Sequence, residues 1–323
     1  MNYVFSSNFK KYIEDLVEQK HAVGFPYTNS QHSLKVFDKF CKEYYPPEIQ
    51  LTREIALHWA ERRPQEHLKT LSNRISPIRQ LAKYINSIGG EAYIVPPGIP
   101  GKIKRYVPHI FTKQELQAFF GIADEYIYKM VSPVRHLVVP VIFRVLYCCG
   151  LRSSEATGLK VRDVDLETGK ITIRISKGNK DRTVMMSLDL LKLCRIYHKK
   201  LEFIFPERTY FFPNRQDNQY SNGFLSSTFH EIWGKTGISI ISGNSPRVHD
   251  FRHGFAVKRL NLWVEEGKDL QAYLPYLSMY LGHAGLVETD YYLHLVPEFY
   301  PIMTSAFEDR FAHLIPEATN NEA

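Results

Sequence analysis

The chain of 323 residues lacks the features that mark membrane and secreted proteins. It has no run of 18 apolar residues, so no segment is predicted to cross a membrane. Its N-terminal stretch, MNYVFSSNFKKYIEDL, lacks the apolar core and the small-residue cleavage site of a secretory signal. We therefore expect a cytoplasmic protein with no membrane partner.

Cysteine is scarce, and no two cysteines have the CxxC spacing of a metal or redox motif. The four residues are Cys41, Cys148, Cys149 and Cys194. This spacing argues against a zinc framework and against a disulfide framework. We predict that all four side chains are reduced and buried.

Acidic residues are outnumbered, and the formal net charge is +7. Residues 1–110 carry sixteen Lys and Arg against ten Asp and Glu, whereas residues 298–323 carry one Arg against five acids. Basic surfaces attract the phosphates of nucleic acids. A mildly basic protein without such a partner would have the same net charge, so charge alone does not decide the function.

Residues 1–92 predict a small helical domain. The stretch FKKYIEDLV has apolar residues at the i, i+3, i+4, i+7 spacing of one helix face. Further helices are expected at about 30–45, after the N-cap residue Thr52, and at about 66–88. Pro77 should kink or split the last of these helices.

Residues 93–110 predict an interdomain linker. Four prolines and two glycines argue against regular structure in this stretch. Lys102, Lys104 and Arg105 make it basic. We expect these three side chains to contact a nucleic-acid backbone.

Residues 111–297 predict a second domain of mixed α and β structure. Thr112 and Glu115 have the spacing of a helix capping box, and the long apolar stretch PVRHLVVPVIFRVLYCC predicts a buried helix. The alternation in ITIRIS predicts a half-buried strand, and the turn residues on either side fit a three-stranded antiparallel sheet. The whole chain is therefore mainly α with a small antiparallel β-sheet. Residues 298–323 predict a tail helix.

The stretch HDFRHGF concentrates basic and polar side chains, and similar residues stand at the ends of other elements of the second domain. The candidate site residues are Arg152, Lys177, His249, Arg252, His283 and Tyr292. Each has an ordinary alternative: Arg152 can pair with Glu155 at the surface, and Tyr292 is one of 20 tyrosines. A zinc site is an alternative for the histidines alone, but no paired cysteine or carboxylate ligands stand at zinc spacing.

Five motifs in order, CGLRSSEATGL, SKGNKDR, HDFRH, LGHAGL and TDYYLH, resemble those of the tyrosine recombinase (phage integrase) family. The resemblance covers the second domain. It extends more loosely to the first, which is similar to the family's helical core-binding (SAM-like) domain. The resemblance implies a two-domain recombinase without an arm-binding domain, whose domains form a C-shaped clamp around duplex DNA.

The resemblance also implies the roles of the main catalytic residues. Arg152 and Arg252 match the two arginines that clamp the scissile phosphate, and planar guanidinium groups suit this task because they bond two oxygens at once. Tyr292 matches the nucleophile, and Lys177 matches a lysine that can protonate the leaving 5′ oxygen. Glu155 matches an acidic residue that supports the first arginine.

The histidines and neighbouring residues have more specific expectations. His249 matches the first position of the H-x-x-R motif and is suited to proton exchange with the tyrosine, and His283 is suited to a hydrogen bond on the phosphate. His253 is similar to a histidine that often follows the second arginine, and we interpret it as structural. Lys180 is expected to contact the DNA backbone or solvent. Tyr291 is expected to pack, because adjacent helical positions point about 100° apart.

As a function, the resemblance implies a site-specific DNA recombinase that cleaves and rejoins duplex DNA through a 3′-phosphotyrosine intermediate. It implies a synaptic tetramer on DNA, and we expect no metal and no other cofactor. The tail helix either docks on a neighbouring subunit, as is common in the family, or packs on its own domain. The absence of an arm-binding domain favours the integration, excision or resolution of a mobile element or replicon. Two alternatives stay open: a type IB topoisomerase that relaxes supercoils, and a catalytically silent DNA-binding protein of the same fold.

Overall fold

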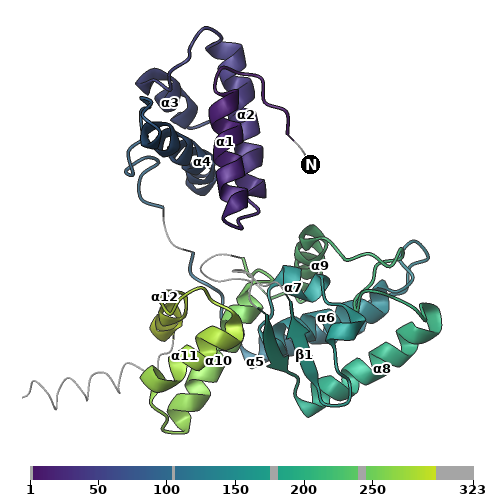
Figure 1. The fold of residues 1–323 in the computed structure, drawn as a ribbon. Helices are drawn as coiled ribbons and strands as arrows, with labels where there is room; N and C mark the ends of the chain where they lie inside the picture. Colours follow the sequence, from purple (N-terminus) through teal and green to yellow (C-terminus); the bar gives the residue numbers. More distant parts are fainter. Residues whose placement is uncertain (1–2, 104–105, 175–180, 239–244, 296–323) are drawn as a thin grey trace, which may run out of the picture. The chain divides into compact units, whose positions relative to one another are not determined.

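A computed structural model describes residues 3–103, 106–174, 181–238 and 245–295. The chain divides into two compact units between Arg105 and Tyr106, which we call the N-terminal unit and the C-terminal unit. Figure 1 shows the order of their elements. No helix in the described ranges is long and apolar enough to cross a membrane.

The N-terminal unit consists of helices packed around one apolar core (Figure 1). They are α1 (Lys10–Ala22), α2 (Thr28–Tyr44), α3 (Arg53–Ala60) and α4 (Leu68–Ser87). The Thr52 hydroxyl caps α3 as predicted, by accepting a hydrogen bond from the backbone N–H of Ile55 at 3.4 Å. Pro77 was predicted to kink or split the fourth helix, and it does not split it. α4 runs through this proline, whose ring is buried in the core, and the packing compensates for the one backbone bond that proline removes.

The predicted linker, residues 93–110, is only partly an unpacked segment. The backbone N–H of Tyr93 donates to the Leu51 carbonyl at 2.8 Å, and Arg79 Nε donates to the Val95 carbonyl at 2.8 Å. Val95 is buried in the core of the N-terminal unit. The first part of the stretch therefore packs on this unit, because its backbone and apolar side chains find partners there. Lys102 is exposed.

The C-terminal unit is mainly helical and carries the small sheet (Figure 1). Its first elements are α5 (Lys113–Asp124), α6 (Arg135–Cys149), α7 (Ser153–Thr157), η1 (Val161–Asp163), β1 (Lys170–Ile173) and β2 (Arg182–Met185). The others are α8 (Leu188–Ile204), α9 (Asn222–Lys235), α10 (Asp250–Glu265), α11 (Leu270–Leu281), α12 (Val287–Asp290) and η2 (Tyr291–Leu295). α6 is the central helix and contacts α5, α7, α8 and α10. The capping box of Thr112 and Glu115 forms at the start of α5 as predicted.

The sheet has two antiparallel strands in the described residues, with Ile171 opposite Val184. The prediction of three strands was wrong. Val164 makes a single bridge to Ile171, and the chain then turns at Asp165, whose carboxylate accepts bonds from the backbone N–H groups of Glu167 and Thr168. This turn leaves no length for a third ladder.

The four cysteines are free, and three of them are buried as predicted. Cys148 is exposed, so the prediction was wrong for this residue. Cys148 and Cys149 are adjacent on α6, and one step along a helix turns the side chain by about 100°. Cys149 occupies the core face, and its neighbour therefore faces outward.

Candidate active site

Arg152 is positioned by the sharp end of α6 and the start of α7. Gly150 ends α6 in the left-handed conformation, with φ of 62°. A Cβ at this position would lie 2.7 Å from the Phe255 ring, so only glycine fits. Arg152 then caps the N-terminus of α7, where its backbone N–H donates to Glu155 Oε2 at 2.8 Å and its Nη1 donates to Glu155 Oε1 at 2.8 Å. The side chain of Arg152 is 18% exposed, so the guanidinium is reachable from solvent.

Arg252 enters the same place from the first turn of α10. It is 2% exposed, and its Nη1 donates to the Gly150 carbonyl at 2.7 Å while its Nη2 donates to the Leu281 carbonyl. Burial lowers the pKa of Arg252 to about 10, and the charge of Arg152 acts in the same direction. Arg252 therefore stays charged at neutral pH and lies in a low-dielectric environment.

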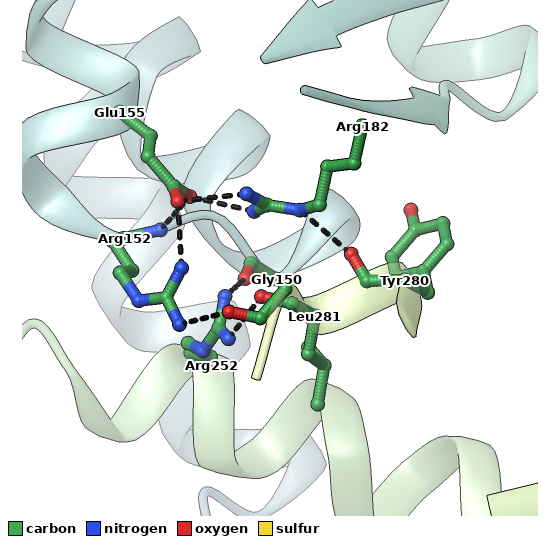
Figure 2. A network of polar contacts seen from close by, with 8 residues as sticks. Gly150, Arg152, Glu155, Arg182, Arg252, Tyr280 and Leu281 are labelled. Carbon is green, nitrogen blue, oxygen red and sulfur yellow. Dashed lines mark hydrogen bonds and ion pairs between the residues drawn. The ribbon is translucent and has the colours of Figure 1, made fainter. Parts of the chain in front are cut away.

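A third arginine that the sequence analysis missed lies in the same network (Figure 2). Arg182 donates from Nη1 to Glu155 Oε1 at 2.8 Å, from Nη2 to Glu155 Oε2 at 2.7 Å, and from Nε to the Tyr280 carbonyl at 2.8 Å. Burial raises the pKa of Glu155, but bonds to Arg182 and then Arg152 outweigh burial and lower it to about 2. The two-residue alternation of a strand could have indicated Arg182, because this residue lies two positions before the buried Val184 and therefore on the same face of β2.

Tyr292 lies buried at 2% exposure in η2, with its hydroxyl 3.1 Å from His253 Nδ1. Burial raises the pKa of Tyr292, whereas the nearby guanidinium groups of Arg252 and Arg152 lower it, and the net shift is upward. The phenol is therefore protonated at neutral pH. The adjacent Tyr291 points to a different partner and donates to the carbonyl of Tyr106 at 3.2 Å.

The histidines are arranged differently from the prediction. We predicted proton exchange between His249 and the tyrosine and a structural role for His253, but the structure places His253 on the Tyr292 hydroxyl. The His249 ring lies edge-on against the His253 ring, with centroids 4.8 Å apart. Burial lowers the pKa of both histidines to about 4, followed by the charge of neighbouring basic groups, so both are neutral at pH 7.

His283 also lies beside the phenol. Its ring stacks near the Tyr292 ring, with centroids 6.1 Å apart and planes 17° apart. Its Nδ1 is 2.8 Å from the hydroxyl of Thr289, which is buried in α12. This contact fixes the orientation of the imidazole beside the tyrosine.

Some predicted site residues lie outside the described residues. They are Lys104, Arg105, Lys177 and Lys180. Their predicted roles remain predictions. The structure brings together seven of the other predicted residues, which are Arg152, Glu155, His249, Arg252, His253, His283 and Tyr292. Lys102 lies in the N-terminal unit, and its predicted role also remains a prediction.

Comparison with known proteins identifies the family of this chain. The phage integrase family matches residues 109–298. The chain belongs to this family. A putative integrase/recombinase, y4rB, of Sinorhizobium fredii is 30% identical over 298 residues, which cover 90% of this chain and 94% of that protein. Tyrosine recombinase XerC of Lactobacillus delbrueckii subsp. bulgaricus is 28% identical over 234 residues, covering 70% of this chain and 72% of that protein. The protein is thus a tyrosine-type site-specific recombinase.

Solved structures share the fold. XerH site-specific recombinase bound to palindromic difH substrate, in a post-cleavage complex, has a TM-score of 0.63 at 20% identity, covering 94% of this chain and 85% of that chain. The Tn1549 transposon integrase in complex with transposon right end DNA has a TM-score of 0.62 at 14% identity, covering 92% of this chain and 99% of that chain. At these identities the comparison establishes the fold of the recombinase.

Proposed function

We propose that this recombinase binds duplex DNA and cleaves a strand by forming a 3′-phosphotyrosine bond at Tyr292. The observation that carries the proposal is the contact between the buried Tyr292 hydroxyl and His253 Nδ1, beside the guanidinium groups of Arg152 and Arg252. A protonated phenol, a neutral base and two cations are together what a phosphoryl transfer to tyrosine requires.

The proposed reaction breaks one ester bond to phosphorus for each ester bond that it forms. The Tyr292 oxygen attacks phosphorus and its proton passes to His253, while the bond from phosphorus to the 5′ oxygen breaks. The leaving 5′ oxygen takes a proton from Lys177, the role that the family resemblance assigns to this lysine. A 5′ hydroxyl of another strand then attacks the phosphotyrosine and reverses the steps. Since one phosphodiester replaces another, the cycle needs no ATP, and we propose that it needs no metal.

The two clamp arginines are suited to the non-bridging phosphate oxygens. A guanidinium group carries five N–H donors in one plane. In the described part of the chain, the Arg152 guanidinium bonds to Glu155 and to the Gly282 carbonyl, and these two bonds do not use all five donors. Arg252 adds a second charge that burial keeps from solvent screening. Together they can stabilise the additional negative charge of the transition state.

Covalent trapping tests the proposal. The recombinase is incubated with DNA fragments that flank its coding sequence, and the attachment point is mapped on a denaturing gel with a nicked substrate. Tyr292→Phe should bind DNA and form no covalent complex, whereas the matched control Tyr291→Phe should still form one. A covalent band that survives Tyr292→Phe would exclude this residue as the nucleophile.

We further propose that the recombinase assembles as a tetramer on two DNA sites and that residues 298–323, which lie outside the described residues, dock on a neighbouring subunit. Truncation after Val296 should then leave single-site affinity unchanged and weaken the paired complex, as measured by light scattering. Normal tetramers of the truncated chain would exclude this role of the tail. Strand exchange between two duplexes distinguishes a recombinase from a topoisomerase, which relaxes supercoils without exchange.

A further inference from the structure

We propose that Arg182 is a positioning residue of the phosphate site, which acts on Arg152 and Arg252 through Glu155 and the last turn of α11. The inference rests on the proposed function, because it takes Arg152 and Arg252 to hold the scissile phosphate. Arg182 is the first residue of β2, and its side chain is 8% exposed. The side chain of Arg182 is less exposed than that of Arg152, which is 18% exposed.

Three guanidinium groups converge on the carbonyls of residues 280–282 (Figure 2). Arg182 Nε donates to the first carbonyl at 2.8 Å, Arg252 Nη2 to the second, and Arg152 Nη2 to the third at 2.6 Å. The last carbonyls of a helix have no partners within the helix, and they form the negative end of its dipole. The end of α11 therefore fixes the three cations relative to one another.

The end of α11 is also followed by the segment that carries the proposed nucleophile, Tyr292. Gly282 has φ of +65°, and a Cβ on it would lie 3.0 Å from Arg182 Nη1. The guanidinium of Arg182 thus packs on this glycine, which His283 follows directly. α12 and Tyr292 come next in the chain. A change at Arg182 is therefore transmitted to both the arginine clamp and the segment that carries the tyrosine.

Arg182 also changes the net charge of the proposed phosphate site. The carboxylate of Glu155 would by itself cancel the charge of Arg152. Arg182 bonds both oxygens of that carboxylate, at 2.8 and 2.7 Å. Among the described residues of this network, three guanidinium groups against one carboxylate leave two positive charges beside the proposed phosphate. A phosphodiester carries one negative charge and gains a second toward the transition state, so the site matches the transition state more closely than the ground state.

A charge-restoring double variant tests the inference. Single-turnover cleavage is measured on a nicked duplex that carries the attachment point mapped for the wild type. Arg182→Gln should slow cleavage about 10- to 100-fold, the range typical of residues that do not contact the ligand but orient the residues that do. Arg182→Gln with Glu155→Gln restores two positive charges and should recover at least about tenfold of that loss. Arg144→Gln is the matched control, since Arg144 bonds Asp124 in the same bidentate way at 2.6 and 2.7 Å, and it should cleave at the wild-type rate.

A methylphosphonate at the cleaved position provides a second readout. It removes the charge of one non-bridging oxygen, so the defect of Arg182→Gln should shrink on this substrate. A double variant as slow as Arg182→Gln, or an equal defect on both substrates, would reduce Arg182 to a structural tie and overturn the inference. If Arg182→Gln does not fold, Arg182→Lys is used instead; it keeps the charge but loses the two parallel bonds to Glu155. Since the charge persists and Arg182 does not contact the phosphate, Arg182→Lys should stay within about tenfold of the wild type, and a larger loss overturns the charge role. A wild type that forms no covalent complex contradicts the proposed function, whereas normal cleavage by Arg182→Gln contradicts only this inference.

Discussion

Each unit of the recombinase holds a cluster of arginine and carboxylate, and the two clusters differ in their charge. In the N-terminal unit Arg74 bonds both oxygens of Glu66, at 3.0 and 2.9 Å. Its remaining donors reach the carbonyls of Trp59 and Glu61, and its guanidinium lies 4.9 Å from the Trp59 ring. Arg74 and Glu66 thus form one bonded pair whose charges cancel and whose polar atoms bond within the protein, although Arg63 also lies close by, 5.7 Å from the Trp59 ring.

In the C-terminal unit three arginines share the single carboxylate of Glu155 or the adjacent carbonyls (Figure 2). Buried charge without a counterion is unfavourable, and the lowered pKa of Arg252, caused first by burial and then by Arg152, expresses that cost. A neutral cluster ties helices together, whereas a cluster with excess charge is adapted to an anion. This difference in charge, more than burial, singles out the arginines that we propose to bind the phosphate.

The largest effect should come from removing an arginine of the charged cluster. Arg252→Lys keeps the charge but cannot bond two oxygens in one plane, and we expect cleavage to fall about 100- to 1000-fold. Arg74→Lys in the neutral cluster should instead lower the free energy of unfolding by about 1–3 kcal/mol and leave the cleavage rate of bound complexes unchanged. Single-turnover gels and thermal unfolding measure the two effects. Equal cleavage defects in both variants would break the comparison.

A smaller effect is expected at the histidine beside the phenol. His253→Gln should slow cleavage about 100-fold, because the side chain at 3.1 Å from the Tyr292 hydroxyl can no longer take its proton. His249→Gln should cost less, since His249 contacts the His253 ring. The pH dependence of kcat/KM distinguishes a base from packing, because loss of a base removes the acid limb of the profile. If His249→Gln is the more damaging variant, the proton passes to His249 and the sequence prediction holds.

Acid should destabilise the C-terminal unit by a moderate amount. Burial, followed by nearby charges, lowers the pKa of His249 and His253 to about 4, whereas an unfolded histidine titrates near about 6.5. Between these values the unfolded chain binds protons that the folded chain does not, so stability falls as the pH drops from about 6.5 to about 4. Thermal unfolding at stepped pH should show this, and replacing both histidines by glutamine should flatten the dependence. Glu155 contributes only at lower pH, because its pKa is lowered from 4.5 to about 2.

The smallest effect is expected at the exposed Lys102. If this lysine contacts one DNA phosphate, Lys102→Ala should weaken binding equally for all sequences and reduce the slope of log affinity against log salt by about one. Fluorescence anisotropy at several salt concentrations measures this slope. An unchanged slope would show that Lys102 makes no phosphate contact.

The sequence alone determined most of the helices and predicted the principal site residues. The 3.6-residue apolar period and the caps at Thr52 and Thr112 are local signals, and the helices begin where they indicate. The resemblance of the ordered motifs to the family predicted Arg152, Arg252 and Tyr292 as site residues, because the order and spacing of motifs can be read directly from the chain.

Only the tertiary structure showed how these residues work together. Arg182 and Glu155 are 27 positions apart and belong to a strand and a helix, and Arg152 and the Gly282 carbonyl are 130 positions apart. No local period encodes contacts over such separations. The same holds for the choice of His253 over His249 as partner of the phenol, since that choice depends on where the chain returns after α11. The packing of α11 against α10 and β2 fixed those distances, and with them the geometry of the site.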